Sequence, residues 1–250
     1  MEPLVIDDAL HLVGVGAYLP KSKTLVVSDL QLGQEGQLRA QGHDVRYQDA
    51  ERMIGLLRAM LHATGATRVV IDGDLKHAFG QILPQERRDV YEIVRALRER
   101  AEVVLVRGNH DTLTGPLARE LDLALVDSWT DGTAFVLHGH ATPARDDPAY
   151  AAASNVIIGH LHPAVTLSDG IRAERVKCAL VGRTAGKRLV VLPSCTTLAI
   201  GADILRVEPR GPFLDPATLD AMTVYLTDET GVRAAGTVRQ VRAAVERLSR

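Results

Sequence analysis

The stretch VVLVRGNHD, residues 103–111, joins a short apolar run to a polar cluster. Its first four residues are β-branched or leucine, which is typical of a strand buried on both faces. The polar part follows Arg107 and offers amide, imidazole and carboxylate groups: Gly108, Asn109, His110 and Asp111. Ligands of open α/β sheets gather at the carboxyl ends of strands. The stretch therefore predicts a buried strand that ends in a ligand-binding loop.

Four other apolar runs end in the same way: residues 25–27, 68–71, 134–137 and 156–158. Their loops carry Asp29, Gln31, Asp72, Asp74, His77, His138, His140, His160 and His162. One polar loop after a strand is uninformative, because loops are polar in general. Five in order, holding six of the nine histidines, predict a single site.

The segments between these strands have helical periodicity. Residues 47–65 and 84–100 each place apolar side chains on one face, and Gly65 and Pro84 stand at helix boundaries. The alternation predicts βαβ units and a central, largely parallel sheet. From about residue 165 the pattern changes to strands without helices, which indicates antiparallel hairpins that complete a second sheet. We expect one domain over residues 1–250, with a strand and helix extension at about 218–250.

Composition sets limits on function. The 250 residues are 46% hydrophobic and 24% charged with a net charge of −2, so no basic excess indicates nucleic acid. The acidic start of the chain lacks the features of a secretory signal, and no apolar run is long enough to cross a bilayer. Cys178 and Cys195 have no metal-binding spacing. We expect reduced thiols, a cytoplasmic location and no membrane partner.

The donor types of the five loops suit particular cations. Carboxylate, amide and imidazole groups without thiolates favour Mn²⁺, Fe²⁺ or similar ions over a structural zinc. The loops offer more donors than one ion needs. A carboxylate shared by two ions about 3.5–4 Å apart is the usual arrangement for hydrolysing phosphate esters.

In this order the five motifs resemble those of the calcineurin-like metallophosphoesterase family. GNHD and GHLH are the most specific of them, and GDLKH, HGH and GHLHP resemble the DNA-ligase-associated and archaeal phosphoesterase subgroup in particular. The resemblance covers nearly the whole chain. It implies an α/β sandwich of two mixed β-sheets flanked by α-helices, with the metals at one sheet edge.

The resemblance also implies roles for individual residues. One metal would be held by Asp29, Gln31, Asp74 and His162. The second would be held by Asp74, Asn109, His138 and His160, with Asp74 as the bridge. His110 would face the scissile phosphate and Asp111 would orient its ring, while a metal-bound hydroxide attacks phosphorus. Two divalent ions are implied, with Mn²⁺ preferred and Fe, Zn, Ni or Mg as alternatives.

Gln31 departs from the family pattern, which has histidine at that position. An amide oxygen can coordinate a hard cation but is a weaker donor than imidazole. We expect Gln31 to coordinate, directly or through water, and the first metal to bind more weakly than the second. In the alternative, Gln31 points to water or substrate and the first metal keeps three protein ligands.

Other residues keep two readings each. His77 would contact substrate or support His110, and His140 would be a ligand in place of His138 or a neighbour of it. Arg39, with Arg46 and Tyr47, lies in residues 33–49, which line a substrate cleft or merely connect two elements. Lys76 is expected to be solvated.

The leading hypothesis is a metal-dependent phosphodiesterase or nuclease that acts on nucleic acid or nucleotides. The subgroup resemblance implies DNA repair and a link to DNA ligase or repair proteins. A phosphomonoesterase or cyclic-nucleotide phosphodiesterase would use the same motifs. From another class, Gln31 leaves open a metal-binding interaction scaffold without catalysis. The helical face with Val241 and Leu248 predicts either internal packing or a homodimer contact.

Overall fold

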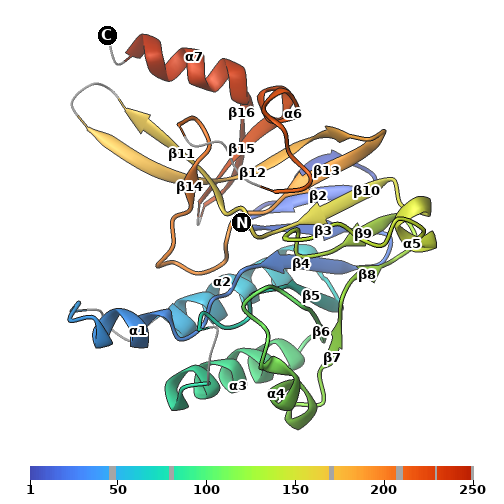
Figure 1. Ribbon diagram of the computed structural model, residues 1–250, viewed down its shortest axis with the longest axis vertical. Helices are drawn as coiled ribbons and strands as arrows, with labels where there is room; N and C mark the ends of the chain where they lie inside the picture. The colour runs from blue at the N-terminus through green and yellow to red at the C-terminus, as the bar shows by residue number, and fades with distance from the viewer. Residues whose placement is uncertain (45–48, 79–81, 169–171, 207–210, 229, 249–250) are drawn as a thin grey trace.

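The computed structural model describes residues 1–44, 49–78, 82–168, 172–206, 211–228 and 230–248. Two mixed β-sheets lie face to face, with helices on both outer sides (Figure 1). The predicted fold class, a sandwich of two mixed sheets flanked by helices, is confirmed.

The first sheet has seven strands in chain order. Its first four strands pair antiparallel, and the remaining three continue in parallel from the fourth. The strands are β1 (Leu4–Asp7), β2 (Leu10–Val13), β3 (Gly16–Leu19), β4 (Thr24–Ser28), β5 (Arg68–Asp72), β6 (Glu102–Val106) and β7 (Ala124–Val126). The three N-terminal strands were not anticipated, because runs of four residues are too short for their periodicity to stand out.

The second sheet has the order β14-β11-β12-β13-β10-β9-β8, and β15 and β16 extend it from β12. Its strands are β8 (Trp129–Thr130), β9 (Ala134–Val136), β10 (Asn155–Ile158), β11 (Pro163–Ser168), β12 (Ala173–Thr184), β13 (Lys187–Val191), β14 (Ala202–Asp203), β15 (Thr223–Asp228) and β16 (Gly231–Thr237). The expectation that β9 and β10 belong to one central sheet with β4 is therefore wrong. Strand patterns do not encode which strands share a sheet.

The helices cover the two outer faces. They are α1 (Gln34–Ala40), α2 (Asp49–Thr64), α3 (Pro84–Arg98), α4 (Thr114–Glu120), α5 (Pro148–Ala152), α6 (Pro216–Ala221) and α7 (Val238–Leu248). In Figure 1, α2 and α3 lie beside the first sheet, and α6 and α7 lie on the side of the second. Helix α1 lies inside the segment that was predicted to line a cleft or connect two elements.

Three apolar layers follow from the period-two pattern of the strands. Leu25 and Val27 of β4 pack with α2 and α3, while Val26 packs between the sheets. In β10, Ile157 packs between the sheets and its neighbours face α5, α6 and α7. These strands are apolar on both faces because one face packs against helices and the other packs against the opposite sheet.

Several local expectations are confirmed. Helix α2 buries Met53, Leu57, Met60 and Leu61, and Gly65 follows it at φ +65°. Residues 223–237 form the expected hairpin before α7, although Glu229 of its turn lies outside the described residues. Arg46 and Tyr47 also lie outside them. In the part of the chain that the structure describes, no helix has the length and apolar character needed to cross a membrane.

Candidate metal centre

The polar loops after β4, β5, β6, β9 and β10 meet at one edge where the two sheets come together. The Asp29 amide donates to the Gly73 carbonyl at 3.2 Å. The His160 amide donates to Asp29 Oδ2 and the His110 amide to Asp74 Oδ1, each at 2.9 Å. Backbone groups of one loop thus hold the carboxylates of another, which fixes the polar side chains relative to one another.

Asp29, Asp74 and His138 form the centre of this cluster. Each offers a ligand atom, and these atoms lie within 4.8 Å of one another. All three residues are buried, with at most 2% of their surface exposed. Buried carboxylates are costly unless they are paired or coordinate a cation. The expected sharing role of Asp74 fits its place, because its Oδ2 lies 3.3 Å from His138 Nε2 and 3.8 Å from His110 Nε2.

The His138 ring is held from both sides. Its Nδ1 lies 3.0 Å from the Asp72 carbonyl, a bond in which the ring N–H donates. This contact leaves Nε2 directed toward Asn109 Oδ1 at 3.2 Å and toward Asp74. Burial lowers the pKa of His138, but the hydrogen bond to Asp74 and the charges of Asp29 and Asp74 outweigh it and raise the pKa to about 10. A proton on Nε2 thus occupies the position from which a ligating histidine would bind a cation.

Asp29 and His162 face each other without a hydrogen bond. Asp29 Oδ1 and His162 Nε2 are 2.9 Å apart, yet neither has a hydrogen-bond partner among the described residues. Burial raises the pKa of Asp29, but the charges of His162 and His138 and the hydrogen bond from the Ser28 hydroxyl lower it to about 2. An ionised carboxylate oxygen and an imidazole nitrogen, both buried and unpaired, are the donors that a divalent cation would satisfy. The residues present therefore fit a metal.

Backbone strain concentrates here. Among the described residues other than glycine, eight have positive φ, and five of these are ligand candidates: Asp29, Gln31, Asp74, His160 and His162. Such conformations cost about 1–3 kcal/mol each and persist where the surroundings impose them, often at functional sites. The strained backbone conformations therefore cost free energy, and they direct these side chains into one cluster.

Two glycines make room for neighbouring ligand side chains. A Cβ at Gly73, where φ is +73°, would lie 2.2 Å from His138 Nδ1, and a Cβ at Gly159 would lie 1.6 Å from Ser28 Oγ. In the structure these two let side chains of other loops pack against the backbone.

His110 is oriented by His77. The His110 Nδ1 lies 2.6 Å from the His77 carbonyl oxygen, and the two rings stack with centroids 5.9 Å apart. Asp111 instead accepts hydrogen bonds from the Gly108 amide at 2.9 Å and the Thr114 hydroxyl at 3.1 Å. These contacts place the Asp111 carboxylate on its own turn, and its orientation of the His110 ring stays a prediction. Of the two readings of His77, the geometry agrees with support of His110.

The remaining candidates are placed less tightly. Gln31 is 6% exposed and its amide donates to the Asp74 carbonyl at 2.8 Å, which puts its backbone in the centre. Coordination by its side chain stays a prediction. The His140 ring lies 5.6 Å from that of His138 and 6.1 Å from that of His160. Arg39 is exposed on α1. Lys76 is fully buried and donates to the Ala78 carbonyl, so the expectation of a solvated lysine is wrong.

The peripheral imidazoles favour their neutral form. Burial lowers the pKa of His77, with His110 as the next cause. Burial and the charge of His138 likewise lower the pKa of His140 and His160. Imidazole binds a cation in its neutral form.

Ser28 and Asp72 also lie at the centre, although neither was predicted to be a metal ligand. The Ser28 hydroxyl lies 2.6 Å from Asp29 Oδ2 and 2.7 Å from the Asp72 carbonyl. The carboxylate of Asp72 has no hydrogen-bond partner among the described residues, and burial raises its pKa. A serine before a carboxylate is too common to signal this support, whereas a second carboxylate beside Gly73 was a visible signal.

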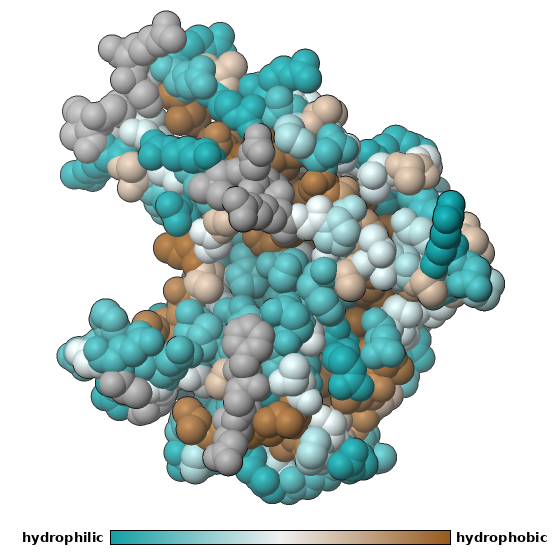
Figure 2. All heavy atoms as spheres, in the orientation of Figure 1, coloured by the Kyte–Doolittle hydropathy of each residue, from teal (hydrophilic) through white to brown (hydrophobic). Residues whose placement is uncertain are grey.

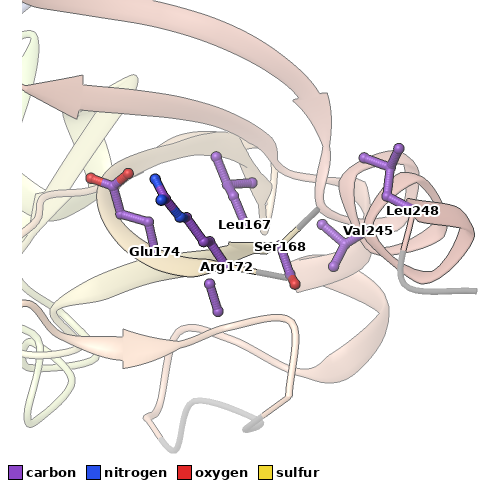
Figure 3. Close-up of a pocket in the computed structure, with 7 residues that line it drawn as sticks. Leu167, Ser168, Arg172, Glu174, Val245 and Leu248 are labelled. Carbon is purple, nitrogen blue, oxygen red and sulfur yellow. The ribbon is translucent and has the colours of Figure 1, made fainter. Parts of the chain in front are cut away.

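One cavity borders the metal centre, and another lies away from it. A groove of about 870 Å³ between α7 and the β11–β12 hairpin, lined by Leu167, Arg172, Glu174 and Leu248, contains none of the ligand candidates (Figure 3). A cavity of about 390 Å³ borders His138 and His140 and reaches Arg107 and Asp127. The space-filling view shows a hollow at the left between the part that holds α1 and the part that holds β11 (Figure 2). The ligand loops after β4 and β10 lead into α1 and β11.

Comparisons with known proteins agree with this architecture. A nuclease MPE from Pseudomonas putida has 23% identity and a TM-score of 0.66, covering 94% of this chain and 99% of its own. The phosphoesterase Yfce from E. coli has 16% identity and a TM-score of 0.41, covering 86% and 98%. Protein AQ665 of Aquifex aeolicus has 15% identity and a TM-score of 0.37, covering 56% and 78%. The first likeness supports the fold, and the other two are too distant to support an argument.

A search of curated protein sequences found no match. The sequence profile of the calcineurin-like phosphoesterases matches residues 22–162, which is more than half of the chain and contains all five loops. The chain therefore belongs to the calcineurin-like phosphoesterase family.

Proposed function

We propose that this protein is a metal-dependent phosphodiesterase that hydrolyses phosphate esters of nucleic acid or nucleotides. The observation that carries the proposal is the placement of the His110 ring beside the cluster of Asp29, Asp74 and His138. With Nδ1 held by the His77 carbonyl, His110 Nε2 points toward Asp74 Oδ2 at 3.8 Å. A phosphoryl group bound at this cluster would lie close to the His110 imidazole.

Two divalent cations, with Mn²⁺ as our first choice, would bring positive charge to the phosphoryl oxygens and lower the pKa of bound water. Asp29, Gln31, Asp74 and His162 would hold one cation, and Asp74, Asn109, His138 and His160 the other. His110 would donate a hydrogen bond or a proton from Nε2 to the phosphate or its leaving oxygen. Removing such a group costs about 10²–10⁴-fold in rate.

A diester is favoured over a monoester by the room beside the centre. The cavity at His138 and His140 has a volume of about 390 Å³ and includes apolar Leu137 and Pro143 as well as polar Arg107 and Asp127. Volumes of about 300 Å³ and above suit organic ligands. A nucleoside leaving group would find apolar walls and hydrogen-bonding edges there. The solved nuclease with the same fold is the reason to include nucleic acid among the substrates. We further propose DNA as that nucleic acid and a link to DNA repair, as the resemblance to the DNA-ligase-associated subgroup implies.

The test uses metal-stripped protein reloaded with Mn²⁺. The substrates are bis-p-nitrophenyl phosphate, p-nitrophenyl phosphate, 2′,3′-cyclic nucleotides and end-labelled single- and double-stranded DNA. His110→Ala should lose about 10³-fold in kcat on diesters while binding Mn²⁺ normally. His62→Ala, on the exposed face of α2, is the matched control and should behave as wild type. Cleavage of the monoester alone would turn the assignment to a phosphomonoesterase, and an unaffected His110→Ala would refute the role of His110.

A further inference from the structure

Lys177 of β12 lies behind the metal centre and is engaged with a single short segment. Its Nζ donates to the Ser194 carbonyl at 2.6 Å and to the Thr196 carbonyl, and lies 3.0 Å from Ser194 Oγ. These contacts use the three donors that an ammonium group has. Burial lowers the pKa of Lys177 to about 8, against the raising influence of Cys195, Asp49 and Asp29. Lys177 belongs to none of the candidate ligand sets.

The segment that Lys177 contacts, residues 194–197, is itself attached to Asp29. The Cys195 amide donates to the Ser28 carbonyl at 2.8 Å and lies 3.2 Å from the Asp29 carbonyl. Ser28 and Ser194 form a parallel bridge, which joins the end of β4 to this segment. Asp29 has φ +55°, so its unusual backbone conformation depends on such contacts.

The same segment is anchored on its other side by Asp49, at the start of α2. Asp49 Oδ2 accepts from the Thr196 hydroxyl at 2.8 Å, and Oδ1 accepts from the Thr197 amide at 2.9 Å. Ser194, Cys195 and Thr196 are at most 1% exposed. Residues 194–196 are therefore a buried connector: the Ser194 and Thr196 carbonyls face Lys177, and the Cys195 and Thr196 amides face the Asp29 carbonyl.

We propose that Lys177 is a positioning residue for the metal centre: its ammonium fixes the 194–197 segment, whose amides fix the backbone of Asp29. The inference rests on the proposed function, because it concerns how a candidate metal ligand is held. Groups that orient ligands without touching the metal typically change metal affinity about 10–100-fold when they are removed. Lys177 acts one step further back, through the backbone, so we expect the lower end of that range.

A matched control exists in the same sheet. Lys187, at the start of β13, donates through Nζ to the Ala151 and Ala153 carbonyls at 3.0 and 2.6 Å. It thus ties a strand to another segment, as Lys177 does, but that segment is the C-terminal end of α5, which does not reach Asp29. A cavity of about 360 Å³ beside Lys177, lined also by Leu56, Cys195 and Thr197, leaves room for a longer side chain. Lys177→Arg should therefore keep the contacts.

The experiment compares full-length Lys177→Met, Lys177→Arg and Lys187→Met with wild type. Mn²⁺ affinity is measured by calorimetry, and alkylation of Cys195 by iodoacetamide in metal-free protein is followed by mass spectrometry. Lys177→Met should weaken binding of the weaker Mn²⁺ about tenfold and expose Cys195 to faster alkylation. Lys177→Arg should restore both, and Lys187→Met should lower the melting temperature without changing either. If Lys177→Met does not fold, Lys177→Gln takes its place.

Wild-type Mn²⁺ affinity in Lys177→Met would overturn the inference, and so would an equal loss in Lys187→Met, which would indicate general destabilisation. The two proposals fail in different ways. A wild-type protein that binds no Mn²⁺ refutes the proposed function. Unchanged alkylation of Cys195 in Lys177→Met refutes the hold of Lys177 on the segment, whether or not metal binds.

Discussion

The two halves of the metal centre differ in how they are satisfied by the protein alone. In the His138 corner, which comprises Asn109, His138 and His160, the imidazole of His138 has hydrogen-bonding contacts at both nitrogens. In the Asp29 corner, which comprises Asp29, Gln31 and His162, two buried atoms face each other unpaired. Asp74 lies between them and contacts His138 directly.

This difference indicates what each corner needs. A proton on His138 Nε2, supported by a pKa of about 10, can take the place of a cation in its corner. In the Asp29 corner the charges of His162 and His138 keep the carboxylate ionised, but Asp29 Oδ1 and the His162 nitrogen, 2.9 Å apart, lack a hydrogen bond of good geometry. Unpaired buried polar groups cost about 1–3 kcal/mol each, and a cation in the Asp29 corner would relieve that cost. The glutamine in that corner offers a weaker donor for the same task.

The largest effect is expected where the corners join. Asp74→Asn removes the charge that both corners share, so both cations should be lost and kcat should fall at least about 10³-fold, which corresponds to about 4 kcal/mol. Metal content by mass spectrometry and diester turnover measure the two effects. Asp122→Asn, at an exposed turn, is the control. Full metal content in Asp74→Asn would show that the corners bind independently and would break the comparison.

The next largest effect is expected from a substitution that disturbs the Asp29 corner but not the His138 corner. Gly159→Ala would place a Cβ 1.6 Å from Ser28 Oγ and 2.5 Å from Asp29 Oδ2. Overpacking of this kind costs about 1–3 kcal/mol, and this clash lies at the upper end. The melting temperature should fall and the weaker Mn²⁺ should be lost first. Gly55→Ala, in α2 with open space around its Cβ, should be neutral or slightly stabilising.

The sequence predicted the donors better than their arrangement. Asp29, Asp74 and His138 were recognisable because each follows a buried strand, and periodicity reveals where such strands end. The sequence did not reveal that β4 and β9 belong to different sheets, because the pairing of strands depends on contacts between residues that are distant in sequence. The partner of His110 was missed for a related reason: it is a backbone carbonyl, and every residue carries one. Lys76 and Lys177 show the same limit, since burial of a lysine is decided by packing.

Replacing the weak donor should sharpen the comparison. Gln31→His would supply an imidazole in the Asp29 corner, and we expect the weaker Mn²⁺ to bind about tenfold more tightly, about 1.4 kcal/mol. Gln31→Ala should weaken the same ion if the glutamine coordinates. Calorimetric titration of Mn²⁺ into both variants measures the change. Equal affinities in wild type and Gln31→Ala would favour the alternative in which the first metal has three protein ligands. Diester cleavage by Gln31→His but not by wild type would support the scaffold hypothesis.

The smallest effect concerns a carboxylate buried away from any cation. Asp89 of α3 is 4% exposed, and burial raises its pKa to about 6, with the charges of Glu35 and Glu92 adding to the effect. Its neutral form is therefore favoured in the folded protein. The ionised form destabilises the fold fully above pH 6, and this cost disappears as the pH falls from 6 to below 4.

Asp89→Asn removes that ionisation and keeps an oxygen that can accept from Gln85 Nε2. We expect about 1 kcal/mol more stability at pH 7 and no gain at pH 3.5, as measured by urea unfolding, because solvent screening reduces the full effect of two pKa units. Glu92→Gln, exposed on the same helix, should change stability by less than about 0.5 kcal/mol. A gain that does not depend on pH would mean that the pKa of Asp89 is the same in the folded and the unfolded protein, so that burial does not disfavour its ionised form. Its burial would then differ from that of Asp29, whose ionised carboxylate is supported by two imidazoles.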